Sequence, residues 1–269
     1  MNARPFSMLF ALLASTTTFA GSPPRDAPAM FDRYGYANFD AAPSCPSSFI
    51  DIAASGTPLT LTASGTPLAT DDGAAALPPL AQPFELYGAP VSGFVASSNG
   101  YLAAASSLGA EDGGDFSNDC PLPALADNAV ATQSRIMVLH DDLDGGSGTL
   151  ATQYFSTCPR VSDSGAVEAC TVVEWANWSR VNVAGSFDAE VVLYHTTFEI
   201  AVQFRNLQAA YTQGATIGLQ NSDATSSSQY ACNGSHSVAP AACFFDPRFP
   251  PGSLGVADRI FGNGFDTTP

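Results

Sequence analysis

The chain has 269 residues, a formal net charge of −16 and an apolar share of 45%, and all nine of its basic residues are arginine. Nucleic acids and anionic membranes are bound through clustered Lys and Arg, so this charge argues against both as partners. Charged residues make up only 13% of the chain, which excludes a disordered polyelectrolyte, and aromatic residues at 10% supply material for a packed core.

The first 20 residues are typical of a secretory signal peptide. Arg4 gives a positive start, residues 6–14 an apolar stretch, and residues 18–20 a cleavage site of the small-x-small kind. The apolar stretch is far short of the roughly 20 residues that a spanning helix needs. We therefore expect an exported chain without a transmembrane segment, secreted or held at the outer surface of the cell.

Composition divides the rest of the chain into three parts. Residues 21–83 are rich in Pro, Ala, Gly, Ser and Thr and contain a near-repeat at 54–59 and 63–68, which predicts an extended, low-complexity segment with edge strands. Residues 84–246 carry dense strand signals and form the predicted domain. Residues 247–269 are a Pro/Gly-rich tail expected to lie outside the core.

Residues 84–246 alternate apolar runs with glycine, proline and asparagine turns. Between 198 and 204 every second side chain is apolar, a period that a strand uses and a helix cannot. His195-Thr196 lies between the two longest runs and predicts a hairpin turn. The predicted strands are residues 84–87, 93–97, 101–104, 135–139, 149–155, 170–175, 187–194, 197–205 and 215–220. Helical periodicity is weak and confined to 122–133, so we predict an all-β, antiparallel β-sandwich stabilised by disulfides.

The six cysteines suit an oxidising compartment. They contain no closely spaced C-x-x-C pair, so disulfides are favoured over a metal cluster. Six cysteines allow about 15 pairings, and sequence alone does not settle them. Short loops favour two of the pairs and leave the third: Cys158–Cys170, Cys232–Cys243 and Cys45–Cys120.

Three carboxylates follow the apolar run 135–139 directly. Asp141, Asp142 and Asp144 precede a glycine cluster and partly resemble a calcium loop, in which alternate carboxylates surround a hard cation. The set is incomplete, so a calcium site would borrow ligands from residues 111–115 or 118–119. The alternative is a solvated turn in which aspartates cap backbone amides.

The histidines and tryptophans offer weaker signals. His140 beside two aspartates could act as a general base, but the chain has neither H-E-x-x-H nor G-x-S-x-G. His195 is interpreted as a turn residue and His236 as part of a disulfide-closed loop. Alternation places Trp175 in the core, and Trp178 at the strand end is the candidate for an exposed, sugar-stacking aromatic.

Several motifs occur in an order that resembles nidogen-like (NIDO-type) β-sandwich domains of secreted bacterial proteins. They are an aromatic-Gly strand at 84–88, the Ser98-Asn99-Gly100 hairpin, the Asp141-Asp142 strand end, Val173-Glu174-Trp175, and the strands at 187–194, 198–204 and 215–220. The chain departs from the family at Val138-Leu139-His140, where Pro-Phe-Trp is common. The resemblance implies extracellular adhesion or matrix association and supplies no catalytic residue.

The tail also carries a resemblance. Ile260-Phe261 and Gly264-Phe265-Asp266 are similar to the Ile-Phe-x-x-Gly-Phe-acidic endings of exported proteins from xanthomonad-like Gram-negative bacteria, which implies sorting or surface association. We therefore expect a non-catalytic protein for surface adhesion or for binding an extracellular protein or carbohydrate, with calcium as the one candidate cofactor. The alternatives are a secreted hydrolase built on the His140–Asp144 loop and a structural accessory module without a small ligand.

Overall fold

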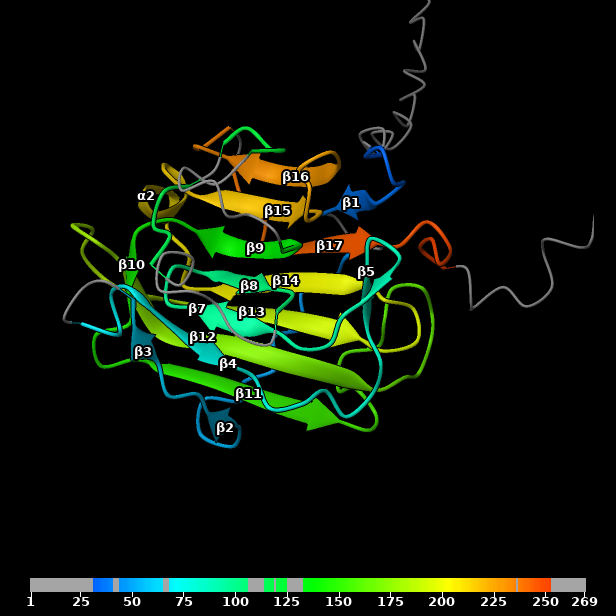
Figure 1. Cartoon of the computed structure of the whole chain (residues 1–269), viewed down its shortest axis with the longest axis horizontal. Helices are drawn as coiled ribbons and strands as arrows, with labels where there is room; N and C mark the ends of the chain where they lie inside the picture. The colour runs from blue at the N-terminus through cyan, green and yellow to red at the C-terminus, as the bar shows by residue number, and fades with distance from the viewer. Residues whose placement is uncertain are drawn as a thin grey trace, which may run out of the picture.

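The computed structural model describes residues 31–40, 44–64, 68–105, 114–118, 120–124, 133–235 and 237–252. The expected signal peptide and most of the tail lie outside these residues. The described elements are almost all strands, paired antiparallel in two main sheets that pack face to face, so the predicted β-sandwich is confirmed (Figure 1). No helix within the described ranges has the length and apolarity needed to cross a bilayer.

The larger sheet is built around three long strands. β12 (Cys170–Arg180) pairs with β11 (Thr149–Phe155) on one side and β13 (Phe187–Tyr194) on the other, and β13 forms the predicted hairpin with β14 (Ile200–Arg205). β17 (Ala241–Phe245) and then β1 (Ala37–Phe39) extend the sheet beyond β14, and β2 (Thr57–Pro58) extends it beyond β11. The short β10 (Leu143–Asp144) pairs with the end of β12.

The smaller sheet has seven strands and covers one face of the larger sheet. In spatial order they are β16 (Ser227–Cys232), β15 (Thr216–Gln220), β9 (Arg135–His140), β8 (Tyr101–Ala103), β7 (Val95–Ser97), β4 (Gly73–Ala76) and β3 (Thr62–Ala63). A separate hairpin joins β5 (Glu85–Leu86) to β6 (Ala89–Pro90), and α2 (Ala209–Thr212) is a single turn. Because β4 pairs with β7, the smaller sheet continues across the domain boundary expected at residue 84.

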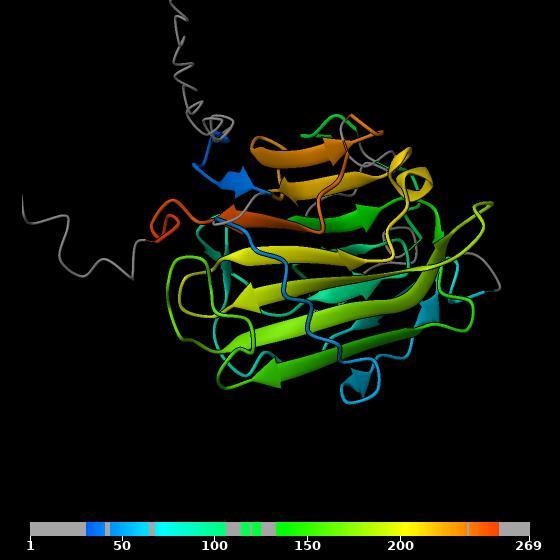
Figure 2. The same ribbon diagram turned by 180° about the vertical axis from the view of Figure 1, so that it is seen from behind.

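The main core lies between the two sheets. It is formed by the inward side chains of each strand, such as Ile136, Val191 and Val202, which are fully buried. A second cluster covers the outer face of the larger sheet, where an extended segment packs its own Ile50 and Ile52 side chains against the strands. We call this segment, residues 45–52, the strap; Figure 2 shows it crossing the strands from the β1 side towards β2.

The disulfides confirm one predicted pairing and correct two. Cys158 pairs with Cys170 across the loop between β11 and β12, as expected. The predicted pairs Cys232–Cys243 and Cys45–Cys120 are wrong, because the bonds are Cys45–Cys243 and Cys120–Cys232, with Cα separations of 5.6 and 5.8 Å. The physical reason is topological. β16 and β17 are neighbours in sequence but belong to different sheets, so Cys243 meets the strap while Cys232 meets the segment around residue 120.

Candidate ligand-binding site

The Asn-Gly turn between β7 and β8 organises one end of the sandwich. Asn99 is fully buried, and its side chain donates to Asp72 Oδ1 (3.0 Å) and accepts the N–H of Leu143 (2.9 Å). Gly100 has φ +74°, and a Cβ there would lie 2.3 Å from the carbonyl oxygen of Leu139. The turn therefore needs glycine, and its asparagine joins the acidic loop to the segment before β4.

Both tryptophans of β12 attach the larger sheet to this turn. Trp175 Nε1 donates to the carbonyl of Ser97, and Trp178 Nε1 to that of Ser98, each at 2.9 Å. Trp178 is only 1% exposed, so the prediction of a sugar-stacking aromatic at this position is wrong. Strict alternation would place the two rings on opposite faces. A register shift between them, with Asn177 at φ +59°, turns both inward.

The carboxylates predicted to bind calcium have separate roles. Asp141 forms an ion pair with Arg180 and accepts the N–H of Asp142 (2.9 Å). Asp144 accepts the N–H of Gly146 (2.8 Å), which is the amide-capping role of a solvated turn. Within the described residues, the three carboxylates do not bring three ligand atoms within 4.8 Å of one another. The calcium site stays a prediction.

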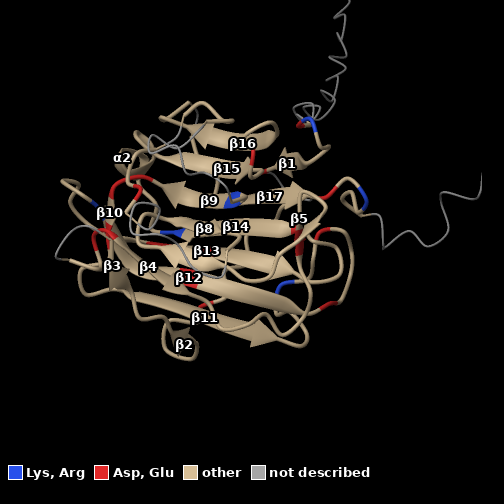
Figure 3. Ribbon diagram, in the orientation of Figure 1, with Lys and Arg blue, Asp and Glu red and all other residues tan. Residues whose placement is uncertain are grey.

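The end of the sandwich nevertheless concentrates negative charge (Figure 3). Burial, together with Asp71, Asp72 and Asp141, raises the pKa of Asp142. The expected second ligand loop is described only from residue 114 to 118. There Asp115 is buried in an ion pair with Arg135 (2.6 Å), and the other acidic residues of that loop lie outside the described residues.

His140 is part of the core of this end. Its ring is fully buried, stacks edge-on against Tyr101 with centroids 4.9 Å apart, and places Nδ1 3.0 Å from the carbonyl of Asn99. It lies beside the acidic loop, as the sequence indicates, but in a packed position. His236 lies outside the described residues, and the disulfide loop expected around it does not form.

His195 occupies the hairpin turn predicted for it and makes two defined contacts. Nδ1 lies 3.1 Å from the carbonyl of Pro83, and Nε2 lies 2.9 Å from Thr171 Oγ1. Because a carbonyl only accepts, the Nδ1 proton donates to Pro83 and Nε2 accepts the threonine hydroxyl. Burial lowers the pKa of His195, so the imidazole is neutral at neutral pH.

A groove of about 320 Å³ lies at the edge of the larger sheet, and Thr171, the hydrogen-bond partner of His195, is part of its lining. β2 pairs with Ala151 and Thr152 of β11, and the N–H of Leu59 donates to the carbonyl of Leu150 (2.8 Å). Among the described residues no strand pairs with positions 153–155 on this side, which leaves that part of the edge open. Tyr154 lies on this open part, is 38% exposed, and packs against His195 with ring centroids 5.9 Å apart. The groove lining is uncharged: Ser55, Thr57, Leu77, Pro78, Pro79, Leu80, Ala81, Thr152, Gln153, Tyr154 and Thr171.

Two other hollows have a similar volume. One, around Gln208, Thr212 and Gln213, is polar but has no aromatic side chain in its lining. The other, between Phe31, Phe39, Phe245 and Pro250, is almost wholly apolar, and its one carboxylate, Asp246, is bound by Arg248. In the groove, by contrast, the Ser55 hydroxyl donates to Gln153 (3.0 Å), and Tyr154 contributes an aromatic ring to the lining. Ligand sites combine apolar or aromatic walls with a few polar groups, and the groove has both. The sequence did not indicate Tyr154, because an aromatic residue in a strand usually belongs to a core.

The fold and the disulfides define the class of protein, which is an antiparallel β-sandwich domain in which all six cysteines form disulfides. A family model described as NIDO related matches residues 44–243, and the chain belongs to this family. The match confirms the resemblance to nidogen-like domains at the level of the family. It runs from the start of the strap to Cys243 and so includes the disulfide that closes the sandwich. Comparison with curated proteins and with solved structures gave no match.

Proposed function

We propose that the chain is an exported, non-catalytic binding module at the outer surface of a Gram-negative bacterium, and that the groove binds neutral carbohydrate. The observation that carries this proposal is the half-exposed ring of Tyr154 in a lining without charged side chains. Sugar rings present C–H faces that stack on aromatic rings and hydroxyls that need donors and acceptors. The tail around Phe261 and Phe265 would serve sorting or surface association.

Calorimetry tests the proposal. A panel of neutral and charged oligosaccharides is titrated into the full chain, and neutral ones are expected to bind with little dependence on salt. Tyr154→Ala should weaken binding about tenfold or more, because an aromatic contact worth ~1.5 kcal/mol corresponds to that change in Kd. Phe31→Ala is the matched control, since Phe31 is 71% exposed in the apolar hollow. Binding that survives Tyr154→Ala, or only charged ligands binding, would contradict the proposal.

The same samples separate binding from turnover. Recovery of the saccharide intact supports a binding module, whereas cleaved saccharide would show a hydrolase. In that case Thr171 and His195 are the pair to mutate, because a hydroxyl donating to a neutral imidazole is the arrangement of a nucleophile and its base. Thr171 lines the groove, whereas His140 does not.

A further inference from the structure

The strap is held on the larger sheet by a row of three fully buried side chains. Glu174, Glu190 and Gln203 are direct cross-strand partners on β12, β13 and β14. Every second strap amide donates to this row: Ser48 N–H to Gln203 (2.6 Å), Ile50 N–H to Glu190 (3.0 Å) and Ile52 N–H to Glu174 (2.6 Å). The row therefore satisfies backbone groups that would otherwise be buried without partners.

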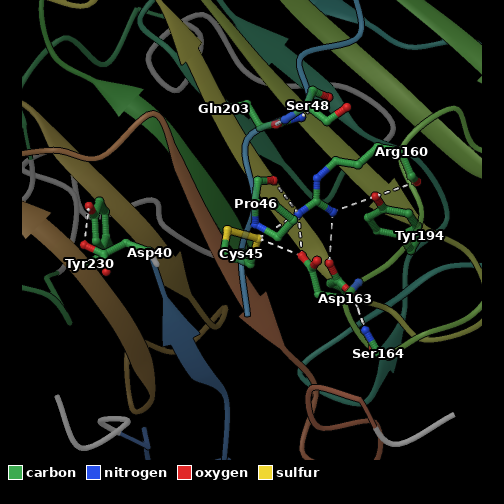
Figure 4. The surroundings of a disulfide bond; sticks show 12 residues. Asp40, Cys45, Pro46, Ser48, Arg160, Asp163, Ser164, Tyr194, Gln203 and Tyr230 are labelled. Atoms are coloured by element: carbon green, nitrogen blue, oxygen red, sulfur yellow. Dashed lines mark hydrogen bonds and ion pairs between the residues drawn. A yellow bond between two sulfur atoms is a disulfide. The ribbon is translucent and has the colours of Figure 1, made fainter. Parts of the chain in front are cut away.

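The start of the strap is fixed covalently. Cys45 is bonded to Cys243, and beside this disulfide Arg160 donates to the carbonyl of Pro46 (3.3 Å), as Figure 4 shows. Beyond Pro46 the strap is held by the row, by the buried side chains of Ile50 and Ile52, and by Arg205, which stacks on Phe49 with 4.0 Å between the guanidinium and the ring centroid. Loosening of the row would remove the backbone contacts of the second half of the strap while the first half stays tethered by the disulfide.

The two carboxyl groups of the row have little positive charge to balance them. Glu174 is faced by Asp51 on the strap, Asp188 and Glu190 on β13, and Arg205 on β14; Glu190 is faced by Glu174 and Arg160. Arg205 lies 3.5 Å from Glu174 but is shared with Asp51 (2.9 Å) and Asp188 (3.3 Å). Burial raises the pKa of Glu174 to about 7, and burial with repulsion by Glu174 raises the pKa of Glu190 well above its ordinary value.

We propose that Glu174 and Glu190 form a proton-operated latch: the strap stays seated while the two carboxyl groups hold protons, and their ionisation releases it. Release lets both carboxylates reach water, which removes the cost of a buried charge. The strap leads into one wall of the groove, since the carbonyl of Ile52 accepts the N–H of Gly56 (2.7 Å) and Ser55 lines the groove. That link to the groove rests on the proposed function; the latch itself does not.

The direction of the pH effect follows from proton counting. At a pH between the ordinary glutamate pKa and the raised values, Glu174 and Glu190 hold protons when the strap is seated and lose them when it is released. Raising the pH therefore favours release, by up to about tenfold in the population of the released form per pH unit for each carboxyl group. Lowering the pH below the ordinary glutamate range gives no further effect, because both forms are then protonated.

Hydrogen exchange of the strap amides tests the latch without any ligand. Protection factors of Ile50 and Ile52, corrected for intrinsic base catalysis, are expected to fall at least about tenfold per pH unit from about pH 5 to about pH 7. Val191 and Val202 in the sheet exchange through global unfolding and should stay more strongly protected than the strap amides at every pH. The double variant Glu174→Gln, Glu190→Gln should remove the pH dependence of the strap protection factors. The control Glu85→Gln, the same change at a half-buried position on β5, should leave that pH dependence unchanged.

Two results would overturn the latch: strap protection that does not change with pH in the natural chain, or an unchanged slope in the double variant. If the double variant does not fold, the latch is tested by following the carbon-13 chemical shifts of the glutamate carboxyl groups in the natural chain as the pH is changed. A Glu190 carboxyl that is still protonated at neutral pH supports the latch, and full ionisation of both groups at about pH 5 refutes it. Neither experiment depends on saccharide binding, so the two proposals fail separately.

Discussion

Asn99 shows how one side chain at a tight turn joins parts of the chain that are distant in sequence. Its amide bridges Asp72 and Leu143, and the flanking carbonyls of Ser97 and Ser98 receive the two indoles. The Ser-Asn-Gly motif, the paired aspartates and the Val-Glu-Trp strand therefore meet at one place. Their order in the sequence predicts the family because the fold brings them into contact.

Removing this bridge should be costly. We expect Asn99→Ala to lower the free energy of unfolding by about 2–4 kcal/mol, because it leaves a buried N–H and a buried carboxylate without their partner. Asn38→Ala is the control, since Asn38 is only partly buried at the edge strand. Urea unfolding of both variants checks the difference. Equal losses in the two variants would mean that the turn does not organise this end.

At the scale of residues, the position of a side chain could not be predicted where the backbone is irregular. Alternation correctly puts Trp175 in the core, but the bulge that also buries Trp178 depends on Asn177 in a left-handed conformation. The contacts of Asp141 and Asp144 could not be predicted for a similar reason. Their partners, Arg180 and the Gly146 amide, are set by β12 and by the turn, which the sequence shows only as separate segments.

At the scale of elements, local pairing was predictable and long-range pairing was not. The hairpin of β13 and β14 and the Cys158–Cys170 bond follow from short separations along the chain. The strap could not be found this way. Its sequence has no strand periodicity, and the row beneath it is visible only as scattered Glu and Gln residues in otherwise apolar strands.

The corrected disulfides predict a ranking of stability. In the chain-entropy account, the Cys45–Cys243 bond closes 198 residues and Cys158–Cys170 closes 12. Replacing both members of the first pair by serine should cost about 5 kcal/mol, against about 3 kcal/mol for the second. Equilibrium unfolding in guanidinium compares the two double variants. A larger loss for Cys158→Ser, Cys170→Ser would contradict the strap's role in closing the sandwich.

For the whole molecule, buried carboxyl groups set the pH dependence of stability. Burial raises the pKa values of Glu174, Glu190 and Glu199, whereas Arg205 lowers that of Asp51. A raised pKa contributes stability below the ordinary glutamate value and loses it as the pH rises through the folded value. We therefore expect the unfolding free energy to be highest near about pH 5 and to fall towards about pH 8, with up to about 3 kcal/mol of this from Glu174.

Denaturant unfolding at constant ionic strength, carried out across this pH range, checks the prediction. A high negative charge acts in the same direction, since self-repulsion grows as the remaining acids ionise. High salt separates the two effects, because it screens surface repulsion but leaves the buried carboxyls largely unaffected. Stability that rises steadily to about pH 8 would show that these carboxyls are ionised in the folded chain.

The central claim, that the open edge of β11 is a neutral-ligand site, is tested most directly by mapping where a saccharide binds. Backbone amide shifts of the isotope-labelled chain would be recorded during titration with the tightest neutral oligosaccharide from calorimetry. We predict that the perturbed amides cluster at residues 55–57, 77–81 and 152–154, and that Tyr154→Ala removes the shifts. Perturbations centred on the acidic loop at 141–148 or on the apolar hollow around Phe31, or no saturable shifts, would contradict the claim.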